Sequence, residues 1–417
     1  MSDRRSVSIA GAAQVLRPPR DGMVHLRGAE LEAQTLDPGG VTVESGRITA
    51  LQPSARADLV VDASGCAVIP GFVDCHTHLP FAGWREGEFE QKLRGVPYEE
   101  ISRGGGGIRA SARAFAQASD EEILAQARLI AAEMLAAGTT TFECKSGYGL
   151  SREGELRALR LAHELDAQVV QTTLSTALLA HSVPDGWTAD GWMSEVESMM
   201  PEVLASGTVS ALDIFVEAIA FGNEHLELMG QLASAAGLTL RCHVEQFTTM
   251  RSVPVAVAAG ARSVDHLSTI HPDDIAPLAA VPCAAVLLPA AEFLGAEHRA
   301  PARALIEAGA IVVLASDGNP GTAPVFSVPV VLGLAARLYG MSTRELLGAA
   351  TLNAAWTLDV QHDCGSIEVG KRADLLLLDG PAEMLAYRFA RDPVAVAFVN
   401  GEPVYVRDSA AAVRLSG

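Results

Sequence analysis

Short apolar runs alternate with helix-like stretches through the middle of the chain. The apolar runs are typical of buried strands, and they cover residues 72–78, 139–144, 168–175, 211–217, 238–244, 263–266, 284–289 and 310–317. Between the first two runs, Ser119 and Glu122 form a capping box in sequence, apolar residues recur at helical spacing, and Gly138 follows where a helix would end. This regular alternation predicts parallel strands joined by crossover helices.

Eight such units predict an α/β fold, a closed (β/α)8 TIM-like barrel, with a doubly wound open sheet as the alternative. The two ends of the chain differ from the middle. Residues 40–66 and 365–406 carry short β-branched runs separated by Gly, Asn and Asp turns. We interpret them as two halves of one small β-sandwich domain. The predicted division is therefore 1–66 plus 362–417 for the β-domain, and 67–361 for the barrel.

The composition narrows the class of protein. With 49% hydrophobic and 19% charged residues, the chain has enough apolar material for a core, which excludes a mostly disordered protein. The 31 basic and 50 acidic residues give a formal net charge of −19, which argues against a nucleic-acid or anionic-membrane partner. The 6 cysteines form no C-x-x-C pair, and the N-terminus does not resemble a signal peptide, so we expect reduced thiols and a cytoplasmic protein.

Two uncharged runs, residues 275–291 and 318–336, approach the length that spans a membrane. Each contains three prolines. We therefore expect buried strands and turns in both runs, and no membrane partner.

The segment PGFVDCHTH, residues 70–78, ends an apolar run with His76 and His78. Residues two apart on a strand point to the same face, so the two imidazoles can bind one metal ion. Neutral imidazole is a favoured ligand for zinc or iron. An isolated H-x-H pair is as easily a chance or surface feature, but its place at a strand end favours the metal.

Three later strands end in the same way, with His243, His266 and Asp317. The carboxyl ends of parallel barrel strands meet at one rim, so these residues are expected around a common point. Three histidines and one carboxylate make an open metal site in which water takes the remaining position. A single His or Asp at a strand end is more often a cap or a loop hydrogen-bonding group. The evidence for a metal site is therefore the placement of all these residues at strand ends together.

Such a centre predicts a metal-assisted hydrolase of C–N bonds. A bound metal lowers the pKa of water toward neutrality and makes hydroxide available for attack on an electrophilic carbon. Asp317 could bind the metal, accept the proton of the nucleophile and deliver it to the leaving nitrogen. His266 could stabilise the oxyanion that develops.

These residues resemble those of the amidohydrolase superfamily, whose members combine a (β/α)8 barrel with a small β-domain built from both termini. Over residues 40–400 the chain also resembles the imidazolonepropionases, which open the ring of 4-imidazolone-5-propanoate to N-formimidoyl-L-glutamate in L-histidine degradation. The segments that carry this resemblance are FAGWREGEF (81–89), YEEISRGGGGI (98–108), KSGYGL (145–150), AHSVP (180–184) and DGNPGT (317–322).

The resemblance implies a role for each matching residue. It makes His76, His78, His243 and Asp317 the ligands of one zinc or iron ion per chain, and it assigns catalysis to Asp317, His266 and Gln246. The residues that it places on the substrate are Arg85, Tyr98, Tyr148, His181, Gln246, Asn319, Gly321 and Thr322. Arg is suited to bidentate recognition of the propanoate. The expected partner is a small-molecule substrate, and a homodimer is compatible with the resemblance.

Three positions bear on the alternatives. Gln246 stands where metal-dependent deaminases of the superfamily usually have Glu, which counts against a deaminase. Lys145 is the only barrel lysine at a strand end that could bridge two metals, as in hydantoinase-type enzymes, and its KSGYGL context favours one metal. Ala290 replaces a Gly of the family, which leaves the shape of the loop there open but does not affect the metal site. The alternatives are another cyclic amidohydrolase or deaminase acting on a small anionic nitrogen heterocycle, or a non-catalytic metal-binding protein.

Overall fold

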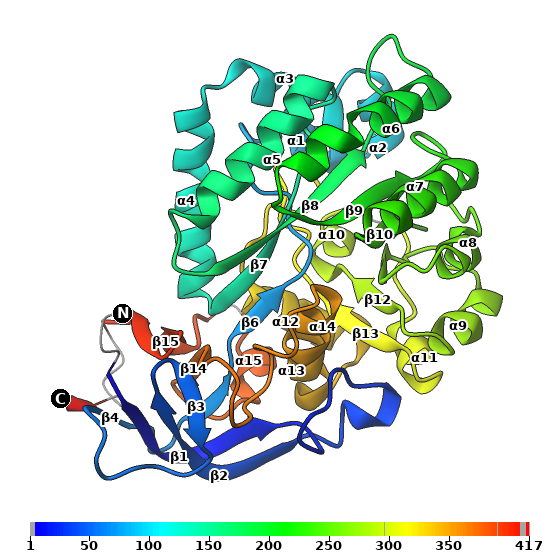
Figure 1. Ribbon diagram of the computed structural model, residues 1–417. Coiled ribbons are helices and arrows are strands. Elements are labelled where there is room, and N and C mark those ends of the chain that lie inside the picture. The colour runs from blue at the N-terminus through cyan, green and yellow to red at the C-terminus, as the bar shows by residue number, and fades with distance from the viewer. Residues whose placement is uncertain (1–4, 296, 390, 409–413, 417) are drawn as a thin grey trace.

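Eight parallel strands in the middle of the chain form one sheet that curves into a barrel (Figure 1). The computed structural model describes residues 5–295, 297–389, 391–408 and 414–416. The barrel strands are β6 (Phe72–Asp74), β7 (Thr139–Lys145), β8 (Thr172–Ala180), β9 (Val209–Val216), β10 (Thr239–Val244), β11 (Ser263–His266), β12 (Ala284–Leu287) and β13 (Ile311–Leu314). Each strand pairs with the next along the chain.

The two edge strands of this sheet meet just beyond their carboxyl ends. Thr77 and Gly318 form a parallel bridge, and the backbone N–H of His78 donates to the carbonyl of Gly318 at 2.9 Å. The sheet therefore closes on itself at the rim where the candidate metal ligands were predicted. The prediction of a (β/α)8 barrel is confirmed, and the open doubly wound sheet is excluded.

One predicted strand is displaced. β8 covers Thr172–Ala180, whereas the sequence pattern places a strand at 168–175. The strand continues through Ala177–Ala180, where small residues and leucines give no particular strand signal, although all four are buried. The β-branched run before it partly belongs to the turn that leaves the preceding helix, where Gln168 N donates to Leu165 O.

Helices cover the outside of the barrel. The helices of the described residues are α1 (Glu86–Leu93), α2 (Tyr98–Arg103), α3 (Ile108–Gln117), α4 (Asp120–Ala136), α5 (Arg152–Asp166), α6 (Ala189–Ala205), α7 (Asn223–Ala236), α8 (Ser252–Ala258), α9 (Pro272–Ala279), α10 (Pro289–Phe293), α11 (Ala302–Glu307), α12 (Val328–Tyr339), α13 (Thr343–Ala350) and α14 (Leu352–Thr357), and the terminal segments add α15 (Met384–Tyr387) and a short 3-10 turn at Gly28–Glu30. Within the described part of the chain, no helix is both long and apolar enough to cross a membrane.

The capping box predicted between the first two barrel strands is confirmed. Ser119 Oγ accepts a hydrogen bond from Glu122 N at 3.3 Å, and Ser119 N donates to Glu122 Oε2 at 2.8 Å, at the start of α4. Gly138 follows the helix end with φ of 97°, a conformation that favours glycine.

We expected buried strands and turns throughout the uncharged run 318–336, and this is wrong for the second half of the run. Residues from Val328 onward belong to α12, and Pro329 lies in the first turn of that helix. Proline is tolerated there because its missing N–H would have no intrahelical partner. Proline in this run therefore marks the start of a helix where we had expected a turn.

The two ends of the chain build a second sheet. Its strands are β1 (Val7–Arg17), β2 (Thr35–Glu44), β3 (Arg47–Ala50), β4 (Leu59–Asp62), β5 (Ala67–Pro70), β14 (Leu375–Leu378), β15 (Val394–Val399), β16 (Glu402–Val406) and β17 (Arg414–Ser416). β5 pairs with β14, so the blue N-terminal and red C-terminal strands lie side by side in Figure 1. The small β-domain from both termini is confirmed, and the division at residues 66 and 362 remains our proposal.

The second sheet has an apolar core of its own. Ile9, Val41, Val61, Leu375 and Phe398 are buried in one cluster that draws on both ends of the chain. Burial of this kind is the main favourable contribution to folding, so the C-terminal strands hold the N-terminal ones in place. β5 then leads directly into β6 and fixes the start of the barrel.

Candidate metal centre and active site

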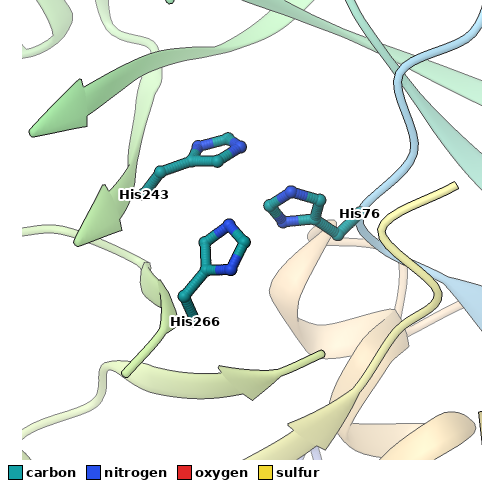
Figure 2. A group of neighbouring side chains, drawn as sticks. All are labelled: His76, His243 and His266. Carbon is teal, nitrogen blue, oxygen red and sulfur yellow. The ribbon is translucent and has the colours of Figure 1, made fainter. Parts of the chain in front are cut away.

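The predicted ligands converge at the carboxyl-terminal rim of the barrel. His76 and His78 follow β6, His243 lies in β10, His266 ends β11, and Asp317 follows β13. All five are almost completely buried. Figure 2 shows the side chains of His76, His243 and His266 pointing toward one another. The ring centroids of His76 and His243 lie 4.4 Å apart, and those of His243 and His266 lie 5.4 Å apart.

Asp317 joins the same group from the last strand of the barrel. Its Oδ1 lies 3.5 Å from His76 Nε2 and 3.3 Å from His78 Nε2. Two triplets of ligand atoms fall within 4.8 Å of one another, His76 with His243 and His266, and His76 with His78 and Asp317. Because both triplets include His76, the structure describes one centre.

The buried ring nitrogens of this centre fit a metal ion. His76 Nε2 and His243 Nε2 have no hydrogen-bond partner among the described residues, although both rings are buried. A buried polar atom without a partner is costly, and a metal ion would satisfy both nitrogens at once. Imidazole nitrogens with one carboxylate are also the donors that suit zinc or iron.

Two aspartates hold the opposite nitrogens of these rings. His76 Nδ1 lies 2.6 Å from Asp265 Oδ2, and His243 Nδ1 lies 3.1 Å from Asp213 Oδ1. An ionised carboxylate can only accept, so in each pair the histidine Nδ1–H is the donor. This fixes the tautomer that presents a lone pair on Nε2, as carboxylates behind metal-binding histidines generally do.

Each of these aspartates is paired with a buried cation. Lys145 Nζ lies 2.6 Å from Asp213 and 3.0 Å from Glu143. Arg241 lies 2.6 Å from Glu143 and 3.3 Å from Asp265. These five charged residues, together with Asp317, contain two cations and four carboxylates, a formal charge of −2 when the histidines are neutral.

Burial sets the charge of the histidines in this site. It lowers the pKa of His78 to about 3, and it lowers the pKa of His243 as well. It also holds the pKa values of His181 and His266 well below the usual range, helped by the charge of neighbouring histidines. Neutral imidazole is the form that binds metals.

His76 and Asp317 shift in the opposite direction because they contact each other. Burial and Lys145 lower the pKa of His76, but the hydrogen bond with Asp265 and the nearby carboxylate of Asp317 outweigh them and raise it. Burial raises the pKa of Asp317, but its close contacts with His76 and His78 hold it well below its usual range. The centre therefore favours a positive charge between His76 and Asp317, either a proton or a metal ion.

A pocket opens over this centre and gathers most of the residues predicted to contact the substrate. It is lined by His78, Arg85, Ile108, Tyr148, His181, Phe215, His243, Gln246, Phe247, His266, Asp317, Asn319 and Thr322. The side chain of Tyr98 lies outside the described residues. Ile108, Phe215 and Phe247 are additions that the sequence pattern did not identify.

Arg85 is the cation of this pocket. Its side chain is 6% exposed, and its Nε and Nη1 have no hydrogen-bond partner among the described residues. The carboxylate of Glu88 lies 3.6 Å from Nε. Gly321 packs against the guanidinium so closely that a Cβ there would lie 1.7 Å from Nη2. Arg85 is thus held at the pocket wall with donors available for an anion.

Asn319 shapes the loop at the same wall. Its Nδ2 donates to Asp317 O at 2.6 Å and to Thr322 Oγ1 at 2.8 Å. Its Oδ1 accepts from Gly321 N at 2.8 Å and Thr322 N at 2.7 Å. The side chain therefore ties Asp317 to the segment under Arg85.

Glu245 and Gln246 face different surroundings. Glu245 Oε1 accepts from Ser252 N at 2.6 Å, and Oε2 accepts from Met250 N at 3.2 Å, so its carboxylate holds the following loop. Gln246 lines the pocket and Glu245 does not. The pocket therefore has an amide where a deaminase would need an acid.

Ala290 causes no irregular loop. It is fully buried within α10, which starts at Pro289 and runs to Phe293. Alanine is the best helix former, so the replacement of Gly is compatible with this helix. The shape of this segment, which the sequence left open, is therefore that of a short helix.

The backbone is strained where two of these residues enter the pocket. His266 and Asp317 have φ of 83° and 57°. Such conformations are uncommon for residues other than glycine and are concentrated at functional sites.

Sequence reasoning missed the charged residues beneath the centre. Asp213, Asp265 and Arg241 lie inside apolar strands, and Arg241 is two residues from His243 and shares its face of β10. A charge in an otherwise apolar strand, two residues from a candidate ligand, is a signal that could have found Arg241. Lys92 was also missed; it lines a smaller cavity that shares Gln246, His266 and Thr322 with the main pocket.

Comparisons with known proteins agree with this architecture. The amidohydrolase family model matches residues 255–406. An imidazolonepropionase of Rubrobacter xylanophilus is 42% identical over 396 residues, 90% of this chain and 93% of that protein. One of Pseudomonas entomophila is 40% identical over 338 residues, 80% and 84% of the two chains. The crystal structure of an adenosine deaminase from Xanthomonas campestris with bound zinc covers 97% of this chain and 95% of that one, with a TM-score of 0.67 and 21% identity, a likeness of fold.

Proposed function

Since this chain belongs to the imidazolonepropionase family, we propose that it hydrolyses the C–N bond of the imidazolone ring of 4-imidazolone-5-propanoate, giving N-formimidoyl-L-glutamate in L-histidine degradation. The chain is a hydrolase of the amidohydrolase type. The observation that carries the proposal is one pocket that combines three of the four candidate metal ligands, His78, His243 and Asp317, with an arginine whose donors are available, while His76 lies in the same ligand group.

The candidate ligands of a single metal ion are His76, His78, His243 and Asp317. When bound, a zinc or iron ion at this position supplies hydroxide at neutral pH by lowering the pKa of water. The formal charge of −2 in the surrounding residues favours a divalent ion. Asp213 and Asp265 hold the rings of His243 and His76 in the tautomer that this binding needs.

Arg85 binds the propanoate of the substrate. Its Nε and Nη1 are buried donors without a hydrogen-bond partner among the described residues, and a carboxylate can accept a charge-assisted hydrogen bond from either of them. Tyr148, His181, Gln246 and Thr322 line the same pocket and surround the ring. A chain with a formal charge of −19 repels an anion. Binding of the propanoate therefore needs a local cation, and Arg85 supplies it.

Ring opening consumes one water, whose oxygen bonds to the ring carbonyl carbon as the C–N bond breaks. Asp317 is ionised, because its contacts with His76 and His78 hold its pKa well below the usual range, and it accepts a proton from the water. It then delivers that proton to the leaving nitrogen. His266 is neutral and donates a hydrogen bond to the oxygen that gains negative charge.

Three alternatives lack support in this site. A binuclear centre would need Lys145 as a carboxylated bridge, but its ammonium is paired with Asp213 and Glu143, and these partners outweigh burial and Arg241 to raise its pKa. A deaminase would need an acid at the position of Gln246, and Glu245 is engaged with backbone amides instead. A purely structural metal site would have no reason to open into a pocket with Arg85.

The decisive experiment is incubation of purified protein of known metal content with freshly made imidazolonepropanoate. We expect the absorbance of the ring to disappear while formimidoylglutamate appears in equal amount. Imidazolonepropanoate left intact by metal-loaded protein would overturn the proposal. One metal per chain is expected, and two would support the binuclear alternative.

A further inference from the structure

The loop of residues 146–150 after β7 connects two residues of the pocket. Tyr148 is buried, with its ring centroid 5.4 Å from that of His181 and 6.0 Å from that of His78. The carbonyl of Gly147 lies 3.0 Å from His181 Nδ1. A carbonyl can only accept, so His181 donates from Nδ1 and leaves Nε2 as an acceptor. The loop thus places the ring of Tyr148 and fixes the tautomer of His181.

Glu155, in the first turn of α5, holds this loop from below. Its Oε2 accepts from Gly147 N at 2.9 Å, and its Oε1 accepts from Gly149 N at 2.8 Å and Leu150 N at 2.9 Å. The side chain is fully buried and lines none of the described pockets. Glu155 therefore does not reach the substrate, and its carboxylate serves the loop alone.

The loop needs such support because its backbone is unusual. Gly147 has φ of 111° and Leu150 has φ of 45°, which is uncommon for a residue with a side chain. A Cβ at Gly149 would lie 2.2 Å from Glu155 N, so the loop passes directly over the start of α5. Three amides pointing at one carboxylate compensate for this local strain.

We propose that Glu155 is a positioning residue that acts through Gly147 on Tyr148 and His181, and so sets the affinity for the substrate. Gly147 carries both contacts, since its N–H donates to Glu155 and its carbonyl accepts from His181. The proposal deepens the proposed function and rests on it for the role of Tyr148 and His181 as substrate contacts. The three hydrogen bonds that Glu155 accepts come from backbone amides of the loop and not from candidate metal ligands.

The test is Glu155→Gln, compared with Glu345→Gln as a matched control. Glu345 is also buried and accepts from a backbone amide, Ser342 N at 2.8 Å, but it caps α13 and lines none of the described pockets. We expect Glu155→Gln to raise KM about tenfold, as for the loss of one hydrogen bond to a charged acceptor, with a smaller change in kcat. Metal content should stay at the wild-type level, and Glu345→Gln should leave KM unchanged.

Two further measurements separate positioning from general destabilisation. Hydrogen exchange of the amides of Gly147, Gly149 and Leu150 should accelerate in Glu155→Gln and not in Glu345→Gln. In a His181→Ala background, Glu155→Gln should raise KM by a smaller factor than in the wild type, because part of its effect passes through His181. If Glu155→Gln fails to fold, Glu155→Asp, which withdraws the carboxylate by one methylene, should show the same changes.

Unchanged KM, or unchanged exchange of the three amides, would overturn the role of Glu155. Hydrogen exchange is measured without substrate, so it tests whether Glu155 holds the loop even if the wild-type protein leaves imidazolonepropanoate intact. Absence of wild-type turnover would instead refute the proposed function. The two failures are therefore distinguishable.

Discussion

Replacing Asp265 by Asn should weaken metal binding while leaving the four candidate ligands in place. Asp265 lies behind His76, with Oδ2 2.6 Å from His76 Nδ1, and it also contacts Arg241 at 3.3 Å. The substitution keeps the shape of the side chain and removes its charge. It also offers His76 an N–H donor in place of one carboxylate oxygen, so the ring is no longer confined to the tautomer that frees Nε2.

The magnitude follows from the contact that is lost. A buried hydrogen bond to a charged acceptor contributes about 1.5–3 kcal/mol, which corresponds to roughly 10–100-fold in a binding constant. Substitution of carboxylates behind metal-binding histidines typically costs about 10–100-fold in affinity. Arg241 retains Glu143 and the carbonyl of Cys75, each at 2.6 Å, so the barrel should remain folded. We therefore expect the metal Kd to rise by roughly 10–100-fold.

The assay is competition for zinc between the metal-free protein and a chromophoric chelator. Asp274→Asn is the matched control, because Asp274 is a buried aspartate bound by Arg251 at 2.7 and 2.8 Å and lines none of the described pockets. Asp274→Asn should bind zinc as the wild type does. The comparison requires that both variants keep an intact thermal unfolding transition. If the zinc Kd of Asp265→Asn is then indistinguishable from that of the wild type, the idea that Asp265 fixes the tautomer of His76 is refuted.

Three other predictions test the site and the fold. Asp317→Asn should lower turnover by roughly 10²–10⁴-fold with the fold intact by circular dichroism, and near-normal turnover would remove Asp317 from the mechanism. Arg85→Ala should raise KM by roughly 10–100-fold with little change in kcat, and an unchanged KM would mean that the propanoate is held elsewhere. Burial raises the pKa of Glu292 above its ordinary value of 4.5, so its contribution to stability is complete below pH 4.5 and is lost as the pH rises through the folded pKa. Urea unfolding of Glu292→Gln across this range should show a weaker fall in stability than the wild type, and parallel curves would contradict the sign.

The barrel could be predicted because its signal is local. Each strand is a short apolar run, and Ser119 with Glu122 marks a helix start within four residues of sequence. β1 is the longest strand of the terminal sheet, but it was not predicted, because its Ala and Gly residues give no clear strand signal. Its identity depends on pairing with β2, β4 and β5, which no local pattern contains.

The predicted ligands share a local mark, a polar residue at the end of an apolar strand. The residues behind them have no such mark, because their partners lie far away in sequence: 189 residues separate His76 from Asp265, and 98 separate Arg241 from Glu143. Only closure of the barrel decides which charges meet. Their pairing therefore had to come from the structure.

The binding of a cation explains why charged residues lie inside apolar strands, where their burial lowers the stability of the fold. Burial of an ion is expensive unless it is paired, and here four carboxylates have only two cationic side chains among them. Without a metal, part of the deficit falls on His76, whose pKa is raised by Asp265 and Asp317 against the effect of burial. A divalent ion would balance the remaining charge and replace that proton. The network and the ligands are therefore parts of one cation site, and a substitution that neutralises any of the four carboxylates should weaken metal binding more than it weakens the fold.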